Sequence, residues 1–334
     1  MQKNNNSIVV SSRVRLARNL SAEVFPHTLG AESGYRVFCK IANALEGMFP
    51  QKVYQLSELS ESDFGIMQEK HLISPALVRH SAISGVVLSA DESISMMINE
   101  EDHLREQCIF PGLALEQAYQ KIDAIDSKLD QNLAFAFDQS LGFLTACASN
   151  LGTGMRASVM MFLPALSLTG KISALSDSLK SKGIVLRGSK GEESEEDGYL
   201  FQISNAKTLG KSEREIILMV TDAVRKIAEM EKEERKILAG SNSVAVKDMI
   251  YRAYAILTGA YSLGADEFNQ MLAQVKFGTI LGLLRFKDES IFDKLFLVCQ
   301  PAGLAKVAGH ALVGQNENIF RADYVAQMLR QNRI

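Results

Sequence analysis

The sequence predicts an α+β fold: a mostly antiparallel sheet flanked by helices, followed by an all-α domain. In the first two-thirds of the chain, segments of alternating apolar and polar residues are mixed with helical patterns. They do not follow the strict strand–helix alternation of a parallel doubly wound sheet. From about residue 212 onward nearly every pattern is helical. We therefore expect an α+β domain over residues 1–238 and a helical domain over residues 239–334.

Five segments carry strand signals. Residues 7–16 alternate, so Arg13 and Arg15 would share one face of a strand, with Val14 and Leu16 on the other. Residues 93–101 and 156–161 alternate in the same way. Residues 183–187 and 199–203 are short β-rich runs, and the charged, glycine-bracketed stretch between them is typical of a loop.

Helical patterns occupy much of the remaining chain. Residues 113–129 and 172–179 lie between the expected strands. Residues 216–238 form one long amphipathic pattern, and Gly240 suits the end of that helix. Further helices are expected at about residues 244–257, 265–275 and 323–330.

Composition excludes several classes of protein. The 334 residues include 36 lysines and arginines against 39 acids, a net charge of -3, so no overall basic footprint for nucleic acid exists. The longest apolar run, residues 159–166, contains Pro164 and is far shorter than a membrane span. The first residues lack the apolar core of a signal peptide. We expect a cytoplasmic protein without nucleic-acid or membrane partners.

Cysteine and histidine spacing gives no metal motif. Cys39, Cys108, Cys147 and Cys299 are widely separated, which argues against a disulfide framework and against zinc. The histidines supply no H-E-x-x-H pattern. We therefore predict reduced thiols and no metal site built by the protein.

Two phosphate-binding motifs are matched only in part. Gly152-x-Gly154-x-x-Ala157 resembles a dinucleotide fingerprint, but a strand pattern follows it where a helix is required. Gly210-Lys211-Ser212 resembles the end of a P-loop whose first glycine is replaced by Asn205. Lys211 and Ser212 are instead expected at a helix start.

The most informative residues are five arginines in short polar or glycine-bearing segments: Arg13, Arg15, Arg105, Arg156 and Arg187. Arginine is a permanent cation with a planar fork of donors, so several together would neutralise a polyphosphate. Two of the same segments also carry Glu101 and Glu192. Cations on one side and carboxylates on the other indicate phosphoryl transfer to a cationic acceptor.

Four of these segments occur together and in order: S-S-R-V-R-L-A-R-N, N-E-E-D-H-L-R, C-A-S-N-L-G-T-G-M-R-A-S-V-M and R-G-S-K-G-E-E-S-E. The set resembles the phosphagen (guanidino) kinase superfamily. E-K-H-L-I-S-P, F-Q-I-S-N and T-L-G-K-S-E extend the likeness over nearly the whole chain, and make it similar to bacterial protein-arginine kinases. The resemblance implies a phosphagen-kinase-like catalytic domain with a mostly antiparallel sheet, followed by a helical C-terminal domain.

The resemblance also implies an ATP site. Its residues would be Ser11, Ser12, Arg13, Val14, Arg15, His71, Arg105, Arg156, Ala157, Ser158, Val159, Met160, Arg187, Gly188, Ser189, Lys190, Gly191 and Glu192. In this superfamily Mg²⁺ is held chiefly by the nucleotide phosphates and water, which agrees with the lack of a protein metal motif.

The acceptor would be a guanidinium. Because this group stays protonated, one nitrogen must lose a proton as the new bond forms. Two carboxylates can clamp the planar cation, and the resemblance makes Glu101 the base and Glu192 the second clamp. Cys147 matches the superfamily's reactive cysteine, where nearby arginines, Thr145 and Ser149 would favour the thiolate.

The chain departs from the pattern in two places. Ala148 replaces the proline of the usual C-P-[ST]-N segment, which frees one φ angle beside Cys147. Protein-arginine kinases also carry an R-D-x-x-R-A segment that binds phosphoarginine. Here Glu317 and Asn318 replace its first two residues while Arg321 and Ala322 remain. An acid in place of the phosphate-binding arginine predicts that this regulatory pocket does not work.

The expected function is ATP-dependent phosphorylation of arginine residues in proteins. The S-S-R-V-R segment begins at residue 11, without the helical domain of the small-molecule kinases, and an open cleft would then admit a protein side chain. The resemblance further implies a zinc-binding activator of the McsA type, a Clp protease pathway and a homodimer. Two alternatives remain open: a kinase for free arginine or a related guanidine, and a catalytically silent adaptor that retains the fold.

Overall fold

One eight-stranded sheet organises the first part of the molecule. The computed structural model describes residues 8–78, 80–188, 198–241 and 243–334. The strand order is β2-β3-β4-β5-β1-β8-β10-β9, and every neighbouring pair is antiparallel. The strands are β1 (Val9–Arg18), β2 (Gln51–Gln55), β3 (Gly85–Ser89), β4 (Ile94–Ile98), β5 (Leu104–Pro111), β8 (Met155–Phe162), β9 (Ile184–Gly188) and β10 (Leu200–Asn205). A separate ribbon pairs β6 (Phe137–Asp138) with β7 (Gly142–Phe143). The predicted antiparallel sheet is confirmed.

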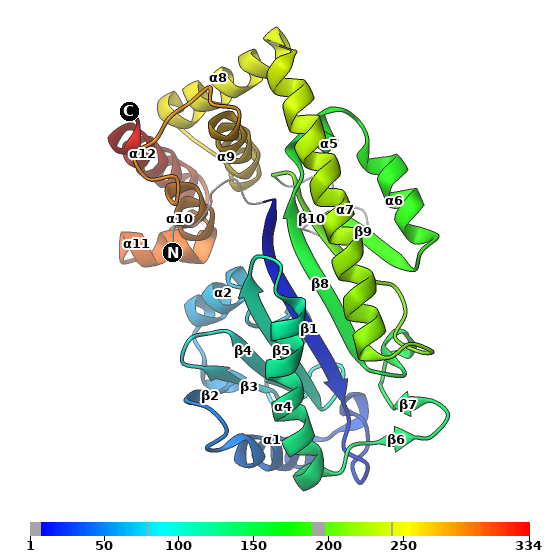
Figure 1. The fold of residues 1–334 in the computed structure, drawn as a ribbon. Helices are drawn as coiled ribbons and strands as arrows, with labels where there is room; N and C mark the ends of the chain where they lie inside the picture. Colours follow the sequence, from blue (N-terminus) through cyan, green and yellow to red (C-terminus); the bar gives the residue numbers. More distant parts are fainter. Residues whose placement is uncertain (1–7, 79, 189–197, 242) are drawn as a thin grey trace.

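Helices flank the sheet and then continue alone to the C-terminus (Figure 1). Those within the sheet region are α1 (Ala31–Leu45), α2 (Glu61–Glu69), α3 (Pro75–Val78), α4 (Leu115–Leu133), α5 (Pro164–Leu168), α6 (Ile172–Lys180) and α7 (Glu213–Gly240), with short 3₁₀ turns η1 (Pro26–Thr28), η2 (Leu56–Glu58) and η3 (Ala148–Asn150). The C-terminal helices are α8 (Val244–Gly259), α9 (Ala265–Ile280), α10 (Ile291–Val298), α11 (Pro301–Ala308) and α12 (Gln315–Asn332).

The longest helix, α7, begins and ends where its sequence indicated. The Ser212 hydroxyl accepts from the Glu215 amide, and the Glu215 carboxylate accepts from the Ser212 amide, so the two form a reciprocal capping box. Gly240 is the last helical residue. Lys211 and Ser212 therefore belong to a helix start and not to a P-loop.

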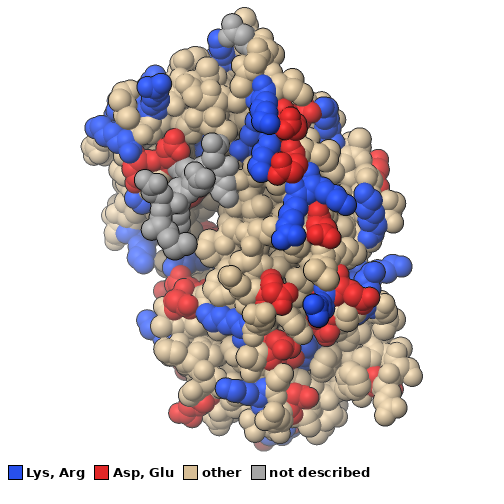
Figure 2. All heavy atoms as spheres, in the orientation of Figure 1, with Lys and Arg blue, Asp and Glu red and all other residues tan. Residues whose placement is uncertain are grey.

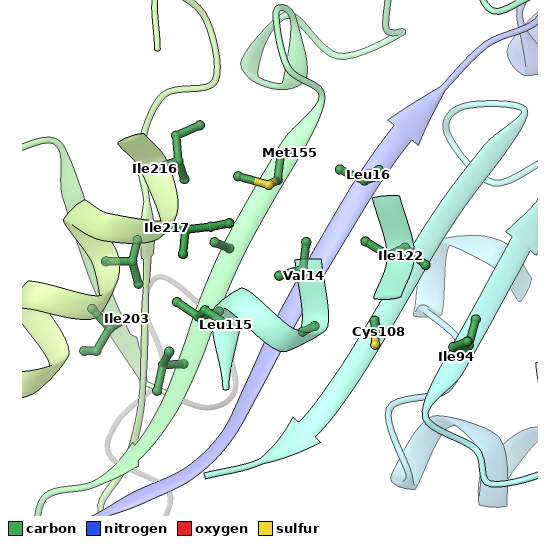
Figure 3. Packing of buried hydrophobic residues seen from close by; sticks show 14 of the residues in the cluster. Val14, Leu16, Ile94, Cys108, Leu115, Ile122, Met155, Ile203, Ile216 and Ile217 are labelled. Atoms are coloured by element: carbon green, nitrogen blue, oxygen red, sulfur yellow. The ribbon is translucent and has the colours of Figure 1, made fainter. Parts of the chain in front are cut away.

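One face of the sheet builds the main hydrophobic core. Val14 and Leu16 of β1 are fully buried there and cluster with Ile122 of α4 and with Ile216 and Ile217 of α7 (Figure 3). Helices α4 and α7 cross this face of the sheet (Figure 1). Because side chains alternate along a strand, burying Val14 and Leu16 sends Arg13 and Arg15 to the opposite face.

That opposite face is apolar at one edge and polar in the middle. On β3 and β4, Val86, Leu88 and Met97 form a small cluster with Met67 of α2 and Leu77 of α3. The strands from β5 through β1 to β9 carry the five arginines instead. The sheet thus uses one face for stability and leaves part of the other for a charged site.

The C-terminal helices form a third cluster of buried residues that includes Phe268, Phe277 and Phe292. Polar contacts join these helices to the sheet region, and the clearest one involves Glu69. The Glu69 carboxylate, at the end of α2, accepts hydrogen bonds from the amides of Ala302 and Gly303 at 2.7 and 2.9 Å. These amides belong to the first turn of α11, so Glu69 caps a helix that lies 233 residues further on.

Some elements differ from the sequence prediction. The strand expected at residues 93–101 ends at Ile98, because Asn99 takes a positive φ of 56° and begins a turn. Strand β5 was not predicted, since Glu106 stands in its core-facing row and breaks the apolar pattern. The helix expected at residues 323–330 is the second half of α12.

The outer surface of α7 is evenly charged. Lysines, arginines and acids are interspersed on the face shown in Figure 2. Three pairs spaced three residues apart lie along α7, namely Arg225–Asp222, Lys232–Glu229 and Lys236–Glu233. Such exposed pairs contribute little to stability.

Candidate active site

Strand register gathers the predicted arginines. Between β1 and β8, Arg15 lies opposite Arg156 and Arg13 lies opposite Ser158. Between β1 and β5, Ala17 lies opposite Arg105. Because residues paired across an antiparallel ladder project to the same face, these side chains share one side of the sheet. Arg13 and Ser158, which are 145 residues apart in the chain, therefore meet at one place.

All five arginines line a single cavity of about 350 Å³. Glu101 and Cys147 line the same cavity. The complete lining is Arg13, Arg15, Leu16, Ala17, Glu100, Glu101, Asp102, Arg105, Cys147, Ser149, Asn150, Gly154, Arg156, Arg187, Gly188 and Gln202. Among the described residues, the five arginines therefore converge on one place.

The arginines repel one another. Withdrawal from water, together with the charges of Arg105 and Arg156, lowers the pKa of Arg13 to about 10. The pKa of Arg15 is also lowered, by withdrawal from water and then by the charges of Arg13, Arg105 and Arg156. Both side chains remain charged at neutral pH and partly accessible from the cavity. An anion placed among them would relieve this repulsion, so the cavity is suited to a polyphosphate.

A tight turn between β4 and β5 presents the acidic residues. Asn99 holds the turn in place, since its amide group donates to the carbonyls of Gly34 and Ile83 at 2.9 and 2.7 Å. His103 anchors the other end: its Nδ1 accepts from the Leu20 amide at 3.1 Å. The neutral ring must then carry its proton on Nε2, which donates to the Val24 carbonyl at 2.9 Å.

Glu100 and Glu101 take different roles in this turn. Glu100 is buried and forms a salt bridge with Arg105, and it also accepts a hydrogen bond from the Ser74 hydroxyl. Burial opposes its ionisation, but Arg105 and Ser74 together hold the pKa of Glu100 below its usual value. Glu101, by contrast, is exposed to the cavity. Glu100 was not among the predicted site residues, although it stands directly beside Glu101.

The loop that carries Cys147 is attached to the same turn. The Asp102 carboxylate accepts from the Ala146 amide at 2.7 Å and from the Asn19 side chain at 2.6 Å. The Cys147 sulfur lies 3.1 Å from the Ser149 hydroxyl. Ala148, which replaces the usual proline, begins the short 3₁₀ turn η3. The thiol and Glu101 are thus positioned by one network.

A buried arginine supports the base of the site. Arg18 binds Asp126 of α4 through two nitrogens, at 2.9 and 2.8 Å. A third nitrogen donates to the Thr153 carbonyl at 3.0 Å. Gly154 follows with a φ of 63°, and an added Cβ there would lie 2.6 Å from the Ala17 carbonyl oxygen. Only glycine allows β8 to start so close to β1.

Not every predicted ATP-site residue faces the cavity. Val14, Ala157 and Val159 are buried in the core on the opposite face. Ser12 is also buried, with its hydroxyl donating to the Gly112 carbonyl and accepting from the Ala114 amide.

The other predicted positions lie nearer the cavity. Ser158 accepts from Arg13 at 3.4 Å, and Gln202, which was not predicted, accepts from Arg13 at 2.7 Å. His71 is solvent-exposed, but surrounding protein atoms and the charge of Arg13 lower its pKa. Ser11 and Met160 lie opposite one another on β1 and β8, and Gly188 lines the cavity. Four predicted residues, Ser189, Lys190, Gly191 and Glu192, lie outside the described residues.

The remaining cysteines differ from Cys147. Burial raises the pKa of Cys108 to about 11 and that of Cys299 to about 12, so both are inert thiols. Cys39 is partly buried, and all four cysteines are free. Within the described residues, no group of three or more His, Cys, Asp or Glu side chains is arranged to hold a metal ion.

The altered regulatory stretch forms an internal ion pair. Arg321 of α12 is completely buried and binds the Glu317 carboxylate four residues earlier. It also donates to the Asn318 side chain at 2.8 Å and to the Leu263 and Cys299 carbonyls at 2.9 Å. Both residues that depart from the family pattern therefore bind Arg321.

Comparison with known proteins agrees with this geometry. Residues 35–234 match the ATP:guanido phosphotransferase C-terminal catalytic domain, and residues 243–333 match the protein-arginine kinase McsB C-terminal domain. A protein-arginine kinase of Moorella thermoacetica is 39% identical over 96% of this chain and 94% of its own length. One from Symbiobacterium thermophilum is 40% identical over 96% of this chain and 93% of its own length.

Solved structures show the same fold. A lombricine kinase is 26% identical, with a TM-score of 0.60 over 71% of this chain and 68% of its own. The duplicated taurocyamine kinase from Schistosoma mansoni is 23% identical, with a TM-score of 0.62 over 82% of this chain and 46% of its own, a likeness of fold alone. With its arginine-lined cavity and its two matched regions, the chain belongs to the protein-arginine kinase family of ATP:guanido phosphotransferases.

Proposed function

We propose that this protein uses ATP to phosphorylate the guanidinium group of arginine residues in proteins. The observation that carries the proposal is the convergence of five arginines with Glu101 and Cys147 in one cavity. Relatives 39 to 40% identical over almost the whole chain bear the name protein-arginine kinase, which supports this choice of acceptor.

The arginines would bind the phosphates. Phosphoryl transfer depends mainly on positioning and on neutralising the charge of the transferring group. Arg13, Arg15 and Arg156 project from neighbouring strands of one rigid sheet, so their donors are set before the nucleotide arrives. Arg105 is fixed by its salt bridge with Glu100, which prevents it from drifting away in the free protein.

Glu101 would act on the acceptor. Its carboxylate would orient the guanidinium and take a proton from one nitrogen. That nitrogen forms a bond to the γ-phosphorus while the bond from phosphorus to the bridging oxygen breaks, releasing ADP and leaving a phosphoramidate. Glu192 remains the proposed second clamp, and a Cys147 thiolate would add negative charge beside the cationic acceptor.

Mg²⁺ would be held by the nucleotide phosphates, and it would add positive charge at the transferring group. A zinc-binding activator of the McsA type, a Clp protease pathway and a homodimer are proposed from the family resemblance. Free cysteines and a need for ATP support a cytoplasmic address. We also propose that the catalytic α+β domain ends at residue 238 and that the helical domain begins at residue 239. Among the described helices, none combines the length and the hydropathy needed to cross a membrane.

The test is to incubate the protein with ATP, Mg²⁺ and an unfolded basic protein, and to search for arginine-borne phosphate by mass spectrometry at neutral pH. A parallel reaction with free arginine tests the alternative that the protein is a kinase for the free amino acid. Phosphate found only on free arginine would overturn the proposal.

Glu101→Gln should lower kcat by about 10² to 10⁴. Glu46→Gln, an exposed acid after α1, serves as the control. A silent adaptor would show no turnover in either form.

A further inference from the structure

A second cavity adjoins the first. It has a volume of about 440 Å³ and is lined by His27, Ala76, His80, Glu100, Glu101, Arg105 and Ala146. The two cavities share only Glu100, Glu101 and Arg105. The turn that carries Glu101 therefore stands where they meet.

The charges lining the two cavities are opposite. The first contains five arginines. Among the described residues that line the second cavity, the only arginine is Arg105, and its charge is paired with Glu100. The carboxylate of Glu101 is left as the main formal charge, accompanied by the imidazoles of His27 and His80. The first cavity is therefore suited to an anion and the second to a cation.

The walls of the second cavity are tied to the turn between β4 and β5. His27 lies in η1, just after Val24 and Phe25, which contact the His103 ring through a hydrogen bond and an edge-on aromatic contact. His80 follows α3, whose first turn is held by the Ser74 hydroxyl. Since Ser74 also binds Glu100, both sides of this cavity are positioned relative to the acidic turn.

The chemistry requires two approaches to one phosphorus atom. In an in-line displacement, the attacking atom arrives on the side opposite the leaving oxygen. The polyphosphate site lies among the arginines of the first cavity, so the acceptor must reach Glu101 from another direction. The second cavity opens onto Glu101 from outside the arginine cluster. Its other side chains, Ala76 and Ala146, are small enough to leave room for a long side chain.

We infer that the acceptor arginine enters through this second cavity, and that His27 and His80 are specificity-determining residues on its wall. This inference rests on the proposed function. Both imidazoles are solvent-exposed, so they would meet the polypeptide that carries the arginine. A lysine placed at either position would repel an incoming guanidinium, and a carboxylate there would attract it.

A charge series at each histidine tests the inference. In His80→Lys and His27→Lys, the KM for an unfolded arginine-bearing protein should rise about threefold to tenfold, because the new cation repels the acceptor. In His80→Glu and His27→Glu the same KM should fall. The KM for ATP should stay within about twofold in all four variants. A merely structural role would not make the effect follow the sign of the charge.

The matched control is His310→Lys and His310→Glu, at an exposed histidine after α11. Equal acceptor KM values across the His27 and His80 series would overturn the inference, as would a change in the KM for ATP instead. If the unmodified protein produces no phosphoarginine at all, the proposed function itself is overturned.

A measurement independent of turnover is the protection of His27 and His80 from modification by diethyl pyrocarbonate. An arginine-bearing protein should shield His27 and His80, and ATP alone should not; the reverse pattern contradicts the inference.

Discussion

Two groups of arginines in this molecule have opposite surroundings. Arg18 and Arg321 are buried, and each is bound to a carboxylate and to backbone carbonyls. Arg13 and Arg15 line the cavity, and the charges that shift their pKa values downward are other arginines. The first group has its charge compensated within the chain. The second group lacks that compensation, and this is the expected property of a binding site prepared for an anion.

The difference indicates how function can be distinguished from stability in this fold. Removing a partner from a compensated arginine should destabilise the protein, because a buried charge is left unpaired. Removing one arginine from the cavity should lower the activity but not the stability. The free protein would then have less repulsion between like charges. The following predictions test this distinction, from the largest expected effect to the smallest.

Asp126→Ala should give the largest loss of stability. It leaves the Arg18 side chain, which is 2% exposed, without its carboxylate. Breaking a buried pair in this way costs about 3 to 5 kcal/mol in the free energy of unfolding. Urea unfolding followed by circular dichroism measures the change. Glu116→Ala, an exposed acid on the same helix, should differ little from the unmodified protein, and equal losses for both would contradict the comparison.

Arg13→Met should show the reverse behaviour. We expect kcat/KM for ATP to fall by about 10² to 10³, since a preorganised cation at the transferring phosphate is lost. The free energy of unfolding without nucleotide should stay the same or rise, because Arg105 and Arg156 lose a like-charged neighbour. Steady-state kinetics and urea unfolding on the same sample test both parts. A variant that unfolds more easily while keeping its activity would show that Arg13 is structural.

Glu106→Gln should change the pH dependence of stability. Burial, and then Asp126, raise the pKa of Glu106 well above its usual value. As pH rises from about 4.5, the unfolded chain releases this proton before the folded protein does, so this residue makes stability fall. Glutamine stays neutral, so the variant should gain relative stability from pH 5 to pH 8, by about 1.4 kcal/mol per unit of pKa difference. Urea unfolding at four pH values would show the divergence, and parallel curves would contradict it.

Glu69→Gln should cause a small loss of stability and a local change in motion. Its carboxylate caps α11, and losing the charge there should cost about 1 kcal/mol. Hydrogen exchange of the Ala302 and Gly303 amides should accelerate, because they lose their charged acceptor. Glu61→Gln, exposed at the start of α2, is the control. Unchanged exchange at both amides would mean that Glu69 does not fasten α11 to the sheet region.

Several strands and helices with regular patterns were predicted from the sequence, but the amphipathic helix α1 was not. Alternation identified β1 and β8, and a long amphipathic stretch identified α7. Strand β5 was missed because buried Glu106 interrupts its pattern, and α10 and α11 were missed because each has only 8 residues. A short helix carries too few turns for its periodicity to stand out.

The site was predictable in part for a similar reason. Alternation placed Arg13 and Arg15 on one face, and motif order connected them with Arg105, Arg156 and Arg187. The supporting residues were missed, including Glu100, Ser74 and Asp126. Their roles depend on contacts across long distances in the chain, such as the 108 residues between Arg18 and Asp126. For Glu100 the available signal was its place beside Glu101, although adjacency cannot tell which carboxylate turns toward Arg105.

By itself, the sequence determined which face of each regular strand would be apolar, where α7 would begin and end, and to which family the chain is related. These properties depend on neighbours within a few residues, so local chemistry encodes them. Only the tertiary structure decided that Arg15 stands opposite Arg156, that Glu100 holds Arg105, and that two cavities meet at Glu101. The reason is that strand register and partner choice depend on how the whole core packs, and no local pattern contains that information.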